Sequence, residues 1–166
     1  MKKDFRVQYP LWQMAFIVLL GLILFSVDGA TTEFIHNEDE LRFGTQFPPL
    51  ESVLLYGSIF LTFLLITIFS LKLSKHNKQH PDQKLSMWQI RPIEYLEQDE
   101  GMTYITRRAS QKVYTFFVWA LPFMAVIYIL FEVPRFWMIF GILFLAWMQY
   151  LIYYVEVRRQ LKEEDE

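Results

Sequence analysis

Residues 52–71 read SVLLYGSIFLTFLLITIFSL and carry no charged side chain over 20 positions. The hydrocarbon core of a bilayer is about 30 Å thick, and an α-helix needs roughly 20 apolar residues to cross it. Three other uncharged apolar runs, at residues 11–27, 113–131 and 136–155, have similar lengths. Because only helices and closed barrels satisfy the backbone in lipid, the four runs predict four transmembrane helices.

The composition leaves little room for anything else. The chain has 166 residues, of which 54% are hydrophobic. The longest stretch outside the apolar runs, residues 72–112, is too short to form a soluble core unaided. The absence of cysteine excludes disulfides, thiolate catalysis and Cys-based metal sites. We therefore predict an all-α polytopic membrane protein, with residues 1–166 forming one antiparallel four-helix transmembrane bundle.

The basic residues fall almost entirely on one side of the membrane, and this distribution predicts the orientation of the chain. Fourteen of the 16 Lys and Arg residues fall before residue 11, between residues 72 and 112, or after residue 155. These three segments share one side of the membrane if all four runs cross it. The loop at residues 28–51 is instead rich in Asp and Glu. The positive-inside rule then places both termini and the 72–112 loop in the cytoplasm, with the acidic loop outside.

No ionisable group lies inside any predicted span. The usual marks of pumps, proton relays and intramembrane proteases are therefore absent. Gln149 is the candidate for an intramembrane polar contact, with a bond between helices favoured over contact with a substrate. Pro122 lies midway along the third predicted span, where it removes a backbone hydrogen bond. It is a candidate hinge, although such prolines are more often plain packing features.

Two parts of the cytoplasmic loop are candidate contact sites. The segment around Trp88 alternates apolar and charged residues, which suits either the membrane surface or a protein partner. Arg107, Arg108 and Lys112 precede the third span and are expected at the headgroup layer, where each is attracted to anionic lipid.

Residues 99–110, DEGMTYITRRAS, resemble the acidic–basic lead-in "DER…I..[KR]A" of small four-span bacterial membrane proteins. The resemblance covers this dozen residues and the layout of two plus two spans, and it departs at Gly101, where those families usually have Arg. It implies a bacterial inner-membrane protein with an accessory or regulatory role. Such families carry no assigned chemistry.

No pattern of a catalytic, nucleotide-binding or metalloprotease motif occurs. His76 and His80 are spaced for a shared metal ion but lack further ligands, so no metal or cofactor site is predicted. Basic residues interleaved with acids give nucleic-acid binding no support. We expect a non-enzymatic accessory or regulatory protein that packs against a partner membrane protein. The alternative is a small homo-oligomeric transporter or carrier of lipid or neutral apolar compounds. The third hypothesis is an enzyme that acts at the inner membrane surface through the acids at residues 94–100 or the two histidines.

Overall fold

The computed structural model describes residues 5–36, 41–79 and 100–164, with the backbone alone at residues 5–7, 31–36, 41–46, 100 and 164. The described elements, in chain order, are helix α1 (Phe5–Asp28), strands β1 (Thr31–His36) and β2 (Leu41–Gln46), and helices α2 (Pro49–Gln79), α3 (Glu100–Leu130) and α4 (Arg135–Glu164). The predicted segment around Trp88 lies outside the described residues.

Each predicted apolar run falls in one of the four helices, although α3 ends one residue before the run at 113–131 does, and each helix is long and apolar enough to cross a membrane. The prediction of a multi-pass helical membrane protein is therefore confirmed. The helices also continue past the uncharged runs. α2 ends at Gln79 and α3 begins at Glu100, so both extend into the loop predicted for residues 72–112. The membrane-spanning parts of α3 and α4 are residues 113–130 and 136–155, where no charged side chain occurs.

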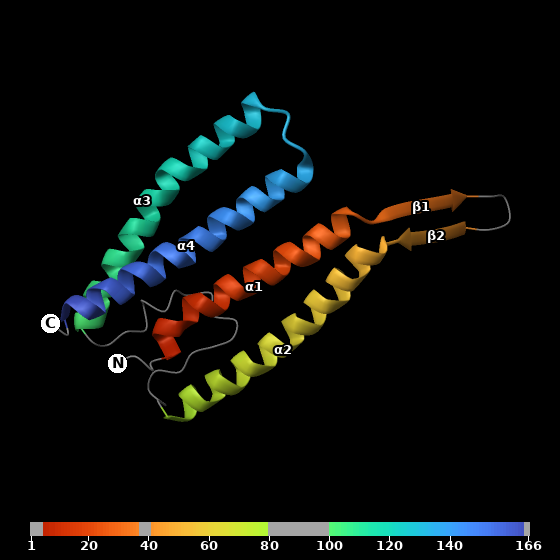
Figure 1. The fold of residues 1–166 in the computed structure, drawn as a ribbon. Helices are drawn as coiled ribbons and strands as arrows, with labels where there is room; N and C mark the ends of the chain where they lie inside the picture. The colour runs from red at the N-terminus through yellow and green to blue at the C-terminus, as the bar shows by residue number, and fades with distance from the viewer. Residues whose placement is uncertain (1–4, 37–40, 80–99, 165–166) are drawn as a thin grey trace.

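The helices form a single row in the order α2, α1, α4, α3 (Figure 1). The main contacts between helices join α1 to α2, α1 to α4, and α3 to α4. Neighbours run antiparallel, so the start of α1 and the end of α4 lie at one end of the bundle, which we call the terminal end (Figure 1). The opposite end, where the α3–α4 connection and the strands lie, is the turn end.

Between α1 and α2 the chain forms a two-stranded antiparallel sheet, which the sequence analysis did not assign. Thr31 pairs with Gln46 and His36 with Leu41, and the strands extend beyond the helices at the turn end (Figure 1). The two strand sequences, TTEFIH and LRFGTQ, are enriched in β-branched and aromatic residues, which favour strands. The acidic loop predicted for residues 28–51 thus contains a β-hairpin.

The termini of the helices follow local rules. Pro49 occupies the first position of α2, where its missing N–H costs nothing, and Glu51 places negative charge in the first turn. At α4, the Pro134 carbonyl accepts hydrogen bonds from the backbone N–H groups of Trp137 and Met138. The short connection between α3 and α4 therefore ends in a turn that starts the next helix, and the two helices form a hairpin.

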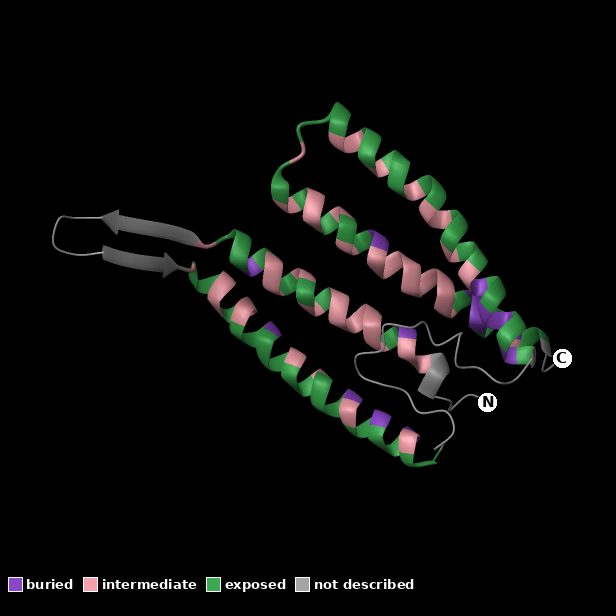
Figure 2. Ribbon diagram, turned by 180° about the vertical axis from the view of Figure 1, so that it is seen from behind, coloured by how far each residue is buried: buried purple, intermediate pink, exposed green. Residues whose placement is uncertain are grey.

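Buried residues gather mostly at the terminal end (Figure 2). Two clusters form there. One consists of Met102, Ile105, Ala109 and Val157 between α3 and α4, and the other of Phe69 and Leu73 on α2 against aromatic residues of α1. By contrast, none of residues 113–130 is buried. Most fully buried residues of the described helices therefore lie at the terminal end, whereas the apolar midsections are partly buried or exposed.

Candidate functional site

A charged cluster joins α3 to α4 at the terminal end. Arg108 and Lys112 lie one turn apart on α3, and Glu156 and Gln160 lie one turn apart on α4. Lys112 Nζ binds Glu156 Oε2, and Arg108 Nε lies 3.8 Å from Glu156 Oε1. Gln160 links both sides, since its amide donates to Glu156 at 3.3 Å and its oxygen accepts from Arg108 at 3.4 Å. The cluster fixes the register of the two helices.

Burial makes Glu156 the centre of this cluster. Its side chain is 5% exposed, whereas those of Lys112 and Arg108 are 46% and 47% exposed. Glu156 lies just beyond the uncharged run of α4. The hydrogen bond from Lys112 lowers the pKa of Glu156, a shift that burial opposes and the charges of Lys112, Arg159 and Arg108 reinforce. Glu156 is thus an ionised anchor, and sequence analysis did not single it out.

The three basic residues predicted at the headgroup layer separate into two groups. Arg108 and Lys112 are bound to Glu156. Arg107 is exposed on a different face of α3, and it forms no ion pair or hydrogen bond within the part of the chain that the structure describes. It lines a groove of about 720 Å³ together with hydroxyl and amide side chains of the same helix. Arg107 alone among the three keeps its charge available.

At the same end, α1 and α2 are joined through aromatic rings. Tyr9, Trp12 and Phe16 of α1 surround Phe69 of α2, with ring centroids 5.7–6.0 Å apart. Lys72 lies over the Trp12 ring, 4.9 Å from its centroid, in the geometry of a cation–π contact. Tyr9 and Trp12 therefore pack the α1–α2 pair together.

Serine and threonine hydroxyl groups within the spans are satisfied by their own helices. Ser26 donates to the Leu22 carbonyl at 2.9 Å, and Thr62 donates to the Ser58 carbonyl at 2.7 Å. The same i to i−4 pattern holds for Thr67, Ser70 and Thr115. These hydroxyl donors are therefore already hydrogen-bonded to backbone carbonyls. The described spans consequently present few polar donors to one another or to a bound molecule.

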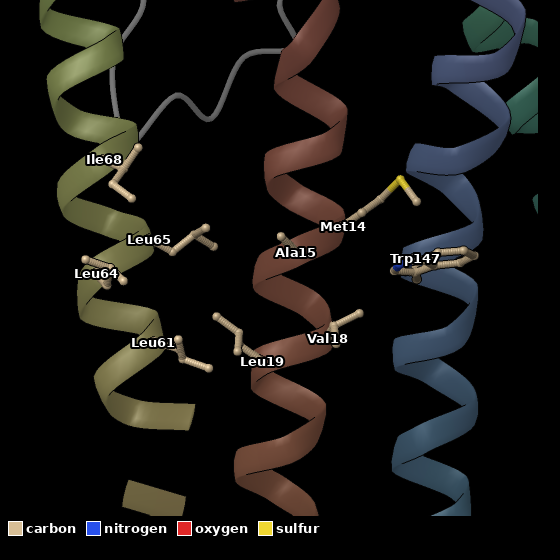
Figure 3. A pocket seen from close by; sticks show the side chains of 9 residues that line it. All are labelled: Met14, Ala15, Val18, Leu19, Leu61, Leu64, Leu65, Ile68 and Trp147. Atoms are coloured by element: carbon tan, nitrogen blue, oxygen red, sulfur yellow. The ribbon is translucent and has the colours of Figure 1, made fainter. Parts of the chain in front are cut away.

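An apolar trough runs along α1 between α2 and α4 (Figure 3). It consists of two adjoining cavities of about 480 and 610 Å³ that share Val18 and Trp147. Ala15, Val18 and Gly21, spaced three residues apart on α1, line its floor. Its walls are formed by Leu61, Leu64, Leu65, Ile68 and Leu54 of α2 and by Phe136, Trp137, Phe140, Leu143, Phe144 and Trp147 of α4.

The floor of the trough is open although α1 has a neighbour on each side. Val18, at the middle of α1, is 52% exposed. The lining side chains of the trough are apolar or aromatic and carry no charge. The lined part of α1 runs from Met14 to Phe25, about three helical turns or roughly 17 Å. The trough therefore offers an elongated apolar surface within the membrane.

The other predicted site residues lie apart from this trough. Gln149 is half-buried on α4, and its amide makes no hydrogen bond to another helix among the described residues. Pro122 is exposed, and α3 continues through it from Glu100 to Leu130. His76 is buried on α2, and His80 lies outside the described residues. Within residues 5–36, 41–79 and 100–164, no three metal-ligating side chains come together.

Comparison with known proteins assigns no family. No family model matches the chain, and neither the curated proteins nor the solved structures include a significant match. The class of protein therefore rests on the fold: a multi-pass membrane protein of four transmembrane helices.

Proposed function

We propose that this chain is a non-enzymatic accessory or regulatory protein that packs against a helix of a partner membrane protein. The trough over α1 carries the proposal. Two small residues on its floor, Ala15 and Gly21, allow a second backbone to approach closely, which is how transmembrane helices associate in lipid. Its roughly 17 Å length and its two apolar walls match three turns of an apolar helix.

Two further features support packing over transport or catalysis. The serine and threonine hydroxyls of the spans bind their own helix backbones, and the four spans contain no charged side chain. Coupled transport of ions usually requires ionisable groups inside the membrane. The charged side chains around Glu156 bind one another and join α3 to α4. In this proposal the cluster is therefore structural.

The proposal extends to location. The distribution of Lys and Arg favours cytoplasmic termini, so the terminal end would face the cytoplasm and the β-hairpin would lie outside. The resemblance of residues 99–110 to four-span bacterial proteins favours the bacterial inner membrane.

A second candidate function follows from the same trough. An apolar groove of this kind also suits an acyl chain or a neutral apolar compound, as a small homo-oligomeric carrier would require. This alternative differs in what occupies the trough and in whether copies of the chain associate.

Photocrosslinking in native membranes tests the proposal. A photoreactive residue at Val18, on the trough floor, is expected to form an adduct with one protein of different mass. The matched control is Phe63, which is 67% exposed on α2 and does not line the trough. It is expected to label lipid only.

Filling the trough provides the second arm. Val18→Trp should abolish the protein adduct formed from a probe at Leu64, whereas Phe63→Trp should leave it unchanged. Adducts between two copies of the chain would favour the carrier. Lipid adducts alone at both Val18 and Phe63 would refute packing against a partner helix.

A further inference from the structure

The contacts between α3 and α4 leave one cation of α3 available. Glu156 engages Arg108 and Lys112, and Glu163 engages Arg159 at 3.0 Å. Arg107 is exposed and is bound by none of the described acids. Its charge is therefore not neutralised by the described part of the protein.

Arg107 lies in a polar groove of about 720 Å³ whose described lining residues include no Asp or Glu. Ser110, Thr106 and Thr115 donate their hydroxyl protons to backbone carbonyls of α3. The donors that the groove offers a ligand include the Arg107 guanidinium, the Gln111 amide and the Tyr114 hydroxyl. These residues follow one another at i, i+4 and i+7, which places them along one face of the helix.

An unneutralised guanidinium with two further donors on the same helix face suits a phosphate ester. A guanidinium can bind two phosphate oxygens at once, and a charge-assisted hydrogen bond is about twice as strong as a neutral one. The groove also lies where the uncharged run of α3 begins, at Val113. Beyond Tyr114, the side chains of Val118, Leu121 and Trp119 are exposed and apolar.

We propose that Arg107, Gln111 and Tyr114 bind the phosphate of an anionic phospholipid, whose acyl chains follow the exposed apolar side of α3. In this proposal Arg107 binds lipid, whereas Arg108 and Lys112 bind Glu156 and hold α3 against α4. This proposal does not depend on a partner in the trough, which lies on α1.

Native mass spectrometry of the detergent-purified full chain tests this site, with phosphatidylglycerol, phosphatidylcholine or inorganic phosphate added. Phosphatidylglycerol is expected to bind best, and Arg107→Gln should weaken its binding by about tenfold, as loss of a charged hydrogen-bond partner implies. The matched control is Arg158→Gln, which removes an exposed cation from the same end of α4. It should change binding by less than about twofold.

A variant that keeps the charge separates a built site from general attraction. Gln111→Leu combined with Tyr114→Phe should also weaken phosphatidylglycerol binding several-fold. Equal losses from Arg107→Gln and Arg158→Gln would overturn the proposal, because they would indicate unspecific charge attraction. Inorganic phosphate binding as tightly as the lipid would overturn the lipid assignment and leave a site for soluble phosphate.

Discussion

The hydroxyl of Tyr128 on α3 occupies the space that a side chain at Gly141 of α4 would take. A Cβ atom added at Gly141 would overlap the Tyr128 oxygen and lie 3.1 Å from the Met124 sulfur. From this position, the Tyr128 hydroxyl donates a hydrogen bond of 2.9 Å to the Met138 carbonyl. The contact joins α3 and α4 near the turn end, where neither helix contributes to the buried clusters.

Gly141→Ala should therefore loosen the α3–α4 pair. The new methyl group displaces the Tyr128 hydroxyl and breaks its hydrogen bond, so the free energy of unfolding should fall by about 1–2 kcal/mol. Unfolding by SDS in mixed micelles measures it. Gly57→Ala is the matched control, because nothing lies within 4 Å of its added Cβ, and better helix propensity should leave stability equal or higher. If Gly141→Ala remains as destabilising in a Tyr128→Phe background, the overlap is not its cause.

Glu156→Gln should weaken the terminal end. The variant leaves Arg108 and Lys112 without their anion, but both are about half exposed and can regain water. We therefore expect a loss of about 1–2 kcal/mol, below the 3–5 kcal/mol typical when a fully buried pair is broken. Glu163→Gln, which breaks an exposed pair with Arg159, should cost under about 0.5 kcal/mol. The charge reversal Lys112→Glu with Glu156→Lys should recover part of the loss; no recovery would argue against a direct pair.

Acid should act on the same carboxylate. Because Lys112 lowers the folded-state pKa of Glu156 below its ordinary value of 4.5, ionised Glu156 stabilises the fold above that value. The stabilisation is lost as the pH falls through the lower, folded-state pKa. The stability of the natural chain should thus decline below about pH 4.5 more steeply than that of Glu156→Gln. Parallel pH profiles for the two proteins would contradict this assignment.

Phe69→Ala should separate α2 from α1 at the terminal end. Phe69 is 3% exposed and contacts three aromatic rings. In a soluble core, such a change costs about 3–5 kcal/mol. Lipid tails are as apolar as the Phe69 side chain, so moving it from the helix interface into lipid costs no hydrophobic free energy. The expected loss is therefore only the packing energy, about 1–2 kcal/mol. Phe60→Ala, at a position 68% exposed, should change the free energy of unfolding by less than about 0.5 kcal/mol, and a similar cost at both positions would refute the packing role.

The spans were predictable because the absence of charge is a strong signal in lipid. The order of the helices was not predictable from the sequence. Phe69 is buried and Phe60 is exposed, yet the two side chains are equally apolar, and in lipid an apolar side chain is stable whether it faces a helix or the acyl chains. For the same reason the sequence did not reveal the trough at Val18. The β-hairpin was missed because its signal is two short strands of six residues each.

The role of Glu156 had a usable signal in the sequence. The short connection at residues 131–134 fixes α3 and α4 as an antiparallel pair, so residues equally distant from Pro134 face each other. Arg108 and Lys112 then meet Gln160 and Glu156, as the structure shows. The sequence analysis assigned Arg107, Arg108 and Lys112 all to lipid headgroups because it did not consider which residues of α4 lie opposite them. Arg107, one residue away, points to another face because successive helical residues are rotated by about 100°.

The order of the helices in the row has a consequence for assembly. α1 with α2, and α3 with α4, each form a hairpin from consecutive helices, and the two hairpins meet mainly through the first and last helices of the chain. The final arrangement therefore cannot be completed until α4 has been synthesised and inserted. Severing the peptide between Gln79 and Glu100 leaves both hairpins whole, so the separate halves, expressed together, should find each other in the bilayer through α1 and α4.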